Sequence, residues 1–168
     1  PRSSSAASDV YKRQMINLVI WNEFLHEKEN DQVKSIYPKG IHECIKEFLS
    51  KDKELSISTA TLEEKDHGLS EELLEKTDVL IWWGHKAHKL VEDKIVDRIQ
   101  QRVLEGMGLL VLHSGHHSKI FKRMMGTTAN LRWAERGEKE RIWVCNPGHP
   151  IADGLDEYFE IEMTEMYG

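Results

Sequence analysis

The sequence contains little cysteine, no long apolar run and no excess of basic residues. Only Cys44 and Cys145 occur among 168 residues, which is too few for a disulfide framework and fits a reducing cytoplasm. No apolar run approaches the length of a membrane span, so no membrane partner is expected. The 23 Lys and Arg residues are outnumbered by 29 Asp and Glu, for a net charge of −6. Nucleic-acid binding needs a basic face, so this partner is not expected either.

Two further features are missing: a phosphate-binding glycine loop and a secretory leader. No predicted strand ends in the glycine spacing that cradles a pyrophosphate. Residues 1–14 show no periodicity and lack the apolar segment of a signal peptide. We interpret them as an expression or sequence-assembly scar ahead of a natural start at Met15. Residues 15–168 are predicted to form a single domain, truncated at its C-terminus because no closing helix follows the last strand-like segment.

Alternating strand-like and helix-like segments after Met15 predict an α/β fold. Short apolar runs are typical of buried parallel strands, and alternation of apolar residues with Ser and Thr is typical of an edge strand. The strand-like segments are 16–21, 55–60 (the edge strand), 79–83, 109–112, 141–145 and 158–163. Helices are expected at about 38–49, 70–74, 91–104 and through 120–125, with a polar loop over 22–36. This order predicts a doubly wound, mainly parallel sheet with helices on both faces.

Histidines follow three of the predicted strands. His26 comes after the first apolar run, and His85 and His88 come after the third strand-like segment. His113 directly follows the run that ends at Leu112. The carboxyl ends of parallel strands lie along one edge of a sheet, where the ligand crevice forms. These imidazoles are therefore expected on the same side of the molecule.

A divalent metal, most simply zinc, is the sharpest hypothesis for this edge. Imidazole is the commonest ligand for zinc, and a catalytic metal keeps two or three protein ligands plus water. The constrained loop from Asn146 to Pro150 supplies one more histidine. The candidate ligands are His113, His149, His85, His26 and His88. The alternative is that these are ordinary solvated or packed side chains, since two histidines three residues apart are also compatible with the start of a helix.

Three other residues near this edge are candidates for binding a substrate. His117 lies one helical turn beyond His113, so that both can face one ligand. Trp83 ends a strand, where an indole near the crevice could stack on a sugar ring. Ser114 lies at a strand-to-helix elbow, where acyl-transfer nucleophiles occur. Leu112 replaces the first glycine of the Gly-x-Ser-x-Gly pattern, which argues against that role.

Five short segments form an ordered set of motifs along the chain. They are Asp78 to His85, Gly108 to Ser114, Gly148 to Ile151, Gly154-Leu155 and Glu165 to Tyr167. The set resembles the ThuA-like family, which is named for trehalose utilisation. The resemblance implies a flavodoxin-like three-layer sandwich related to class I glutamine amidotransferases. It also implies bacterial, cytoplasmic carbohydrate metabolism acting on trehalose or an oxidised (3-keto) disaccharide.

Individual residues of this chain can be compared with the characteristic residues of the ThuA-like family. His113, His149 and Glu165 match the most recognisable polar residues of the family, and His85 and His26 match less universal ones. Where glutamine amidotransferases hold a nucleophilic cysteine, this chain has His113 followed by serine, so glutaminase activity is not expected. Relatives also continue past the C-terminal motif with a further strand, another Gly-His element and a final helix.

Three hypotheses for function follow. The first is a metal-assisted hydrolase, lyase or isomerase acting on a sugar or keto-sugar, with Glu165 or Glu23 transferring a proton. The second is a non-catalytic sugar-binding or scaffold module that has kept the fold. The third is a Ser114-dependent hydrolase. A small sugar is the expected partner, and the sequence leaves a homo-oligomer open.

Overall fold

The computed structural model describes residues 15–167, which fall into two compact units. One unit ends at Ala129 and the other begins at Asn130, and each is described by itself. The scar predicted for residues 1–14 lies outside the described residues. The single truncated domain predicted for residues 15–168 stays a prediction. Within the described part of the chain, no helix is both long and apolar enough to cross a membrane.

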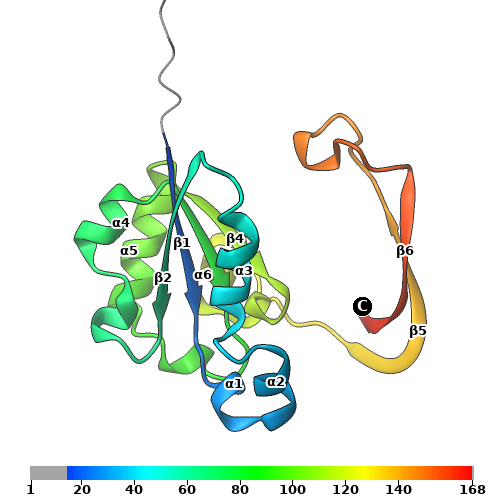
Figure 1. Cartoon of the computed structure of the whole chain (residues 1–168), viewed down its shortest axis with the longest axis horizontal. Helices are drawn as coiled ribbons and strands as arrows, with labels where there is room; N and C mark the ends of the chain where they lie inside the picture. Colours follow the sequence, from blue (N-terminus) through cyan, green and yellow to red (C-terminus); the bar gives the residue numbers. More distant parts are fainter. Residues whose placement is uncertain (1–14, 168) are drawn as a thin grey trace, which may run out of the picture. The chain divides into compact units, whose positions relative to one another are not determined.

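The first unit is built on a four-stranded, all-parallel sheet with the strand order β2-β1-β3-β4 (Figure 1). Its strands are β1 (Ile16–Asn22), β2 (Leu55–Thr61), β3 (Val79–Trp83) and β4 (Gly108–Leu112). The predicted mainly parallel sheet is therefore confirmed, with β2 at one edge as its alternating sequence indicated. The last residues of three strands are in register, because Asn22 pairs with Trp83 and Trp83 pairs with Leu112. The loops that follow these strands consequently leave the sheet side by side.

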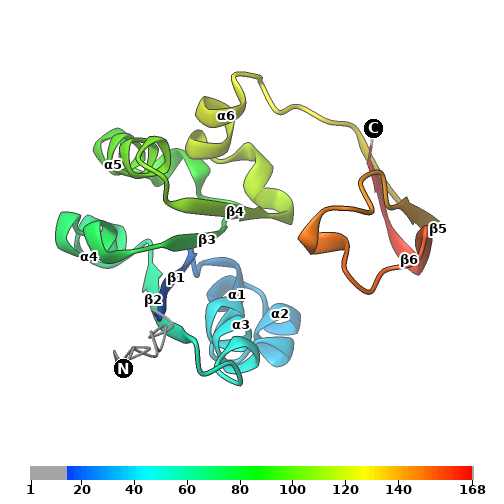
Figure 2. The same cartoon turned by 90° about the horizontal axis from the view of Figure 1, so that it is seen from above.

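Helices cover both faces of this sheet, as Figure 2 shows from above. They are α1 (His26–Glu29), α2 (Asp31–Ile36), α3 (Ile41–Leu49), α4 (Glu71–Lys76), α5 (Asp93–Leu104) and α6 (Lys119–Met125). Short 3₁₀ turns occupy η1 (Lys65–Gly68), η2 (His88–Leu90) and η3 (His113–His117). The Ser70 side chain caps α4 by accepting a hydrogen bond from the Leu73 amide (3.3 Å). This layered arrangement confirms the flavodoxin-like fold class.

Strand alternation divides the core between the two faces of the sheet. Val19 and Trp21 belong to the larger buried cluster, which includes side chains of α4, α5 and α6. Leu18 and Ile20 point the other way and form a smaller cluster with α3. In the larger cluster Trp21 stacks on Trp82 of β3, with ring centroids 3.7 Å apart. The two tryptophans anchor the helical layer that carries α5.

Two sequence-based expectations for this unit were wrong. Residues 22–36 were expected to be a loop, but they contain α1 and α2. Asn30 caps α2 by accepting hydrogen bonds from the amides of Gln32 and Val33, which stabilises a helix too short and polar to show apolar periodicity. The run at 109–112 was expected to be fully buried, yet Leu110 is 48% exposed. The reason is that β4 pairs on one side only within the described residues, so it is an outer strand of the sheet.

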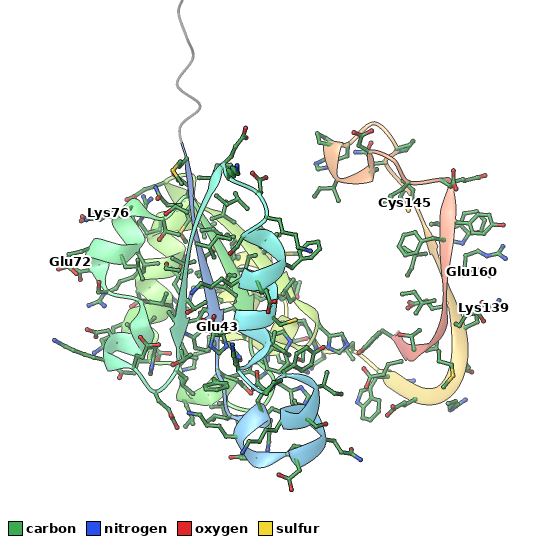
Figure 3. All side chains as sticks on the ribbon, viewed as in Figure 1. Glu43, Glu72, Lys76, Lys139, Cys145 and Glu160 are labelled. Carbon is green, nitrogen blue, oxygen red and sulfur yellow. The ribbon has the colours of Figure 1, made fainter. Side chains whose placement is uncertain are left out.

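The second unit is an antiparallel ribbon of two strands, β5 (Trp133–Trp143) and β6 (Tyr158–Tyr167), joined through a 3₁₀ turn η4 (Pro150–Ala152). β5 begins well before the predicted segment 141–145 but ends at Trp143, so Cys145 lies after it, and β6 extends beyond the predicted segment 158–163. Glu160 on β6 accepts hydrogen bonds from Lys139 (3.1 Å) and Arg141 (2.7 Å) on β5 (Figure 3). No described residue of this unit is buried.

Candidate active site

The loops that follow β1 and β3 bring two histidines into ring contact. His26, in α1 after β1, stacks on His85, in the loop after β3, with ring centroids 4.7 Å apart and ring planes 11° apart. Partial burial lowers the pKa of His85, and the neighbouring His26 and His113 lower it further, against the opposing effect of Glu23. His113 is thus close enough to His85 to act on it electrostatically. The loops after β1, β3 and β4 lie together at one edge of the sheet, on the side expected from the sequence.

Glu23 orders the loop that carries His85 and His88. Its side chain is 1% exposed, and its two carboxylate oxygens accept hydrogen bonds from the amides of Lys86 (2.7 Å) and Ala87 (2.9 Å). Such charge-assisted bonds are about twice as strong as neutral ones. Both oxygens are engaged, so these contacts make Glu23 a positioning residue. Its predicted role in proton transfer stays a prediction.

His88 and His117 form a second pair of imidazoles. Their ring centroids lie 6.2 Å apart, and the buried Nε2 atom of His88 has no hydrogen-bond partner among the described residues. Burial lowers the pKa of His88, and the neighbouring His117, His85 and Lys122 lower it further, while Glu23 opposes them. Partial burial, His116 and Lys122 likewise lower the pKa of His117. Both rings are therefore neutral at neutral pH.

The turn after β4 is tightly constrained. His113 is exposed and adopts a left-handed backbone conformation with φ = 41°, which costs a non-glycine residue about 1 kcal/mol or more. Gly115 is buried, and a Cβ atom added there would lie 2.8 Å from Cγ1 of Val111, so only glycine fits. The Ser114 hydroxyl donates to the Gly84 carbonyl oxygen (2.9 Å) and so ties this turn to the loop after β3. The Ser114 nucleophile stays a prediction.

A cavity of about 700 Å³ opens beside the second imidazole pair. It is lined by Leu25, Glu29, Lys86, Ala87, His88, Lys89, Leu90, His117 and Lys122. Its volume lies within the range of small-molecule sites. Sequence reasoning named the two histidines but missed the three lysines. Two of these stand beside the histidines of the segment His-Lys-Ala-His-Lys, which is the signal that could have revealed them.

The remaining candidates lie at the edge of this region or in the second unit. Trp83 is half-buried at the end of β3, with its ring 6.0 Å from that of His85. His149 caps η4, because its Nδ1 atom accepts a hydrogen bond from the Ile151 amide (3.1 Å). Glu165 accepts a hydrogen bond from the Tyr167 hydroxyl; partial burial and this carboxylate raise the pKa of Tyr167 to about 12. The convergence of His149 and Glu165 with His113 stays a prediction.

A metal site in this region would need at least three suitable side chains close together. Among residues 15–167, no three His, Cys, Asp or Glu side chains lie close enough together to hold a metal ion as they stand. The pairs His26–His85 and His88–His117 each offer two imidazoles, whereas a catalytic zinc site usually has three protein ligands. His149, another predicted ligand, lies in the second unit. The divalent metal, zinc first, stays a prediction.

Comparison with known proteins supports the fold. Residues 17–168 match the family model described as ThuA, trehalose utilisation. A ThuA-like protein of known structure from Bacteroides uniformis is similar with a TM-score of 0.65 and 15% sequence identity. The alignment covers 96% of this chain and 64% of that one, so this chain spans under two thirds of the relative's length. No curated protein matches the chain.

Proposed function

Because the chain belongs to the ThuA family, we propose that it is a bacterial, cytoplasmic enzyme of carbohydrate utilisation that binds a sugar or keto-sugar in the cavity beside His88. The description of the family, trehalose utilisation, supports the carbohydrate role. The cavity volume of about 700 Å³ is sufficient for a disaccharide. Trp83, half-buried at the end of β3 with its ring 6.0 Å from that of His85, would stack on a pyranose ring that extends from the cavity.

The observation that carries the proposal is the pair of imidazoles in the cavity wall, His88 and His117, whose ring centroids lie 6.2 Å apart. The Nε2 atom of His88 is buried and has no hydrogen-bond partner among the described residues, and a buried polar atom without a partner costs about 1–3 kcal/mol. The lowered pKa of His88, caused first by burial, keeps the imidazole neutral and able to accept a proton. Its neighbour His117 is neutral for similar reasons and provides a second acceptor or donor.

In the proposed mechanism His88 removes a proton from a sugar hydroxyl or from the carbon next to a sugar carbonyl. The Glu23 carboxylate and the His88 imidazole both approach Gly84: Glu23 Oε2 and His88 Nδ1 are each 3.4 Å from the point where a Gly84 side chain would begin. This negative charge favours the imidazolium that results. Glu23 acts without leaving its two backbone amides, so it fixes both the position and the charge environment of His88.

The proposal is tested by hydrogen exchange on 3-keto-trehalose in D₂O. The wild-type protein is expected to incorporate deuterium next to the carbonyl, followed by NMR. His88→Gln should slow this by about 100-fold or more, the usual contribution of a general base. His67→Gln is the matched control, because His67 is also partly buried but does not line the cavity. Glu23→Gln should lower both the rate and the ligand affinity, because the amide group cannot accept hydrogen bonds from both Lys86 and Ala87 and the loop that carries His88 would move.

The other two functional hypotheses, a non-catalytic module and a serine hydrolase, predict different results. A keto-sugar that binds without exchange or turnover would favour a non-catalytic module, and the absence of both binding and exchange would end the proposal. Labelling of Ser114 by a fluorophosphonate probe would favour the serine hydrolase. For the predicted divalent metal, zinc first, metal content after purification should be compared between the wild type and His113→Ala; stoichiometric metal only in the wild type would support that hypothesis, and equal sub-stoichiometric metal in both would end it.

A further inference from the structure

The cavity beside His88 collects positive charge in an acidic protein. The whole chain carries a net charge of −6, yet three lysines and two histidines line this cavity against a single carboxylate, that of Glu29. Glu29 is already paired with Lys86. The charge balance of the cavity is therefore opposite to that of the chain.

Two of the lysines have no ion-pair partner within the part of the chain that the structure describes. They are Lys89, at the middle of η2, and Lys122, in α6. The side chain of Lys122 is half-buried and lies close enough to both imidazoles to lower the pKa of His88 and of His117. Two amines and two imidazoles thus line one cavity. A neutral ligand would leave the amines without a counter-charge.

We propose that the ligand of this cavity is an anionic sugar derivative, a sugar phosphate or a sugar acid, whose charged group is bound by Lys122 and Lys89. This inference rests on the proposed function, because it takes the sugar site as given and adds the charge of the sugar. Ammonium groups bind phosphate and carboxylate oxygens by charge-assisted hydrogen bonds. The sugar ring would then extend toward the imidazole of His88 in the cavity wall.

The test is calorimetric titration of the full chain at low ionic strength with trehalose, trehalose 6-phosphate, glucuronate and inorganic phosphate. An anionic sugar is expected to bind at least about tenfold more tightly than trehalose, which corresponds to one favourable ion pair. Lys122→Ala should remove most of this advantage, and so should raising the salt to about 1 M, where screening is strong. Lys76→Ala is the control, because Lys76 is an exposed lysine on α4 outside the cavity (Figure 3).

The outcomes separate the two proposals. Tighter binding of trehalose 6-phosphate identifies a phosphate, and tighter binding of glucuronate identifies a carboxylate; loss of either in Lys122→Ala but not in Lys76→Ala supports the inference. Equal affinity for trehalose and its phosphate, unchanged in Lys122→Ala, would overturn the inference and leave the sugar site standing. Binding of inorganic phosphate alone, or of none of the four probes, would overturn both.

Discussion

The parallel-sheet unit buries many of its apolar side chains, whereas the β5–β6 ribbon leaves its large apolar side chains exposed. Among residues 15–167, all the buried apolar residues lie between Leu18 and Ile120, in the first unit. The ribbon, considered by itself, leaves large side chains such as Trp143 (53%) and Met163 (78%) exposed. A parallel sheet with helices on both faces can bury every strand residue, whereas a two-stranded ribbon has no second layer. Stability within each unit must therefore be distributed very differently.

The polar groups of the two units differ in the same way. The first unit buries Asn22, whose side-chain amide donates to Glu27 (2.7 Å) and meets Nδ1 of His42 (2.8 Å). The ion pairs of the ribbon, such as that of Arg141 with Glu160, lie at the surface. Removing one member of a buried polar network leaves its partners without hydrogen bonds and lowers the free energy of unfolding, whereas exposed ion pairs contribute little to it. Substitutions and changes of pH should therefore affect the stability of the two units to different degrees.

The largest effect is expected from a pair of tryptophan substitutions, one in each unit. Trp82→Ala removes a ring that is 1% exposed and stacked on Trp21, and should lower the free energy of unfolding by about 3–5 kcal/mol. Trp143→Ala removes a ring that is 53% exposed and should cost about 1 kcal/mol or less. Urea denaturation monitored by circular dichroism measures both. Equal losses would show that the ribbon depends on its apolar residues as strongly as the sheet does.

A smaller effect is expected from the pH dependence of stability. Burial lowers the pKa of His42 from its ordinary value of 6.5, and the neutral ring accepts a hydrogen bond from the Asn22 amide, since the oxygen of that amide already accepts from Phe24. Below pH 6.5 the unfolded chain takes up a proton that the folded chain resists. Stability should therefore fall as the pH drops from about 7.5 to 5, by at most about 1.4 kcal/mol per pH unit for each such histidine.

The variant His42→Gln isolates this contribution. Its stability should fall less steeply with acid than that of the wild type, and the remaining slope should reflect the other histidines with lowered pKa values, His85, His88 and His117. Thermal unfolding at a series of pH values gives the two slopes. Parallel curves for wild type and variant would contradict a neutral, buried His42.

The smallest effect is expected from the ribbon's surface charges. Lys139 and Arg141 lower the pKa of Glu160 through hydrogen bonds, Arg141 most strongly, but the pairs are open to solvent and screened by salt. Glu160→Gln should shift the melting temperature less than either change above, and the shift should vanish in about 1 M salt. A large shift that survives high salt would mean that this cluster is shielded from solvent.

Much of the first unit could be predicted because its signals are local. The apolar run at 79–83 is β3, and the stripe predicted for 91–104 differs from α5 only at its start, where Glu92 precedes the first helical residue. The short helices α1 and α2 could not be predicted in this way. They are held by distant contacts, such as the bond from the Ile41 amide to the Glu27 carboxylate (3.0 Å), which no periodicity records.

The candidate site shows the same division. The rule that parallel strands end at one edge placed the histidines of three loops together, and His26 and His85 are indeed in ring contact. The role of Glu23 was not predictable from its neighbours, because its partners are amides of another loop. The contribution of Lys122 was missed because a lysine on a helix is usually solvated, and only the folded cavity distinguishes it.

The hydrogen bonds that Glu23 accepts from two successive amides limit how this protein can be redesigned. A glutamine in its place offers one oxygen and one NH₂ group, and the latter would meet an amide hydrogen instead of accepting it. The nearest chemical substitute therefore displaces the loop that it is meant to preserve. Attempts to broaden ligand selection should leave this carboxylate untouched and vary the cavity wall on α6, where a side chain can be exchanged without moving the backbone that supports His88.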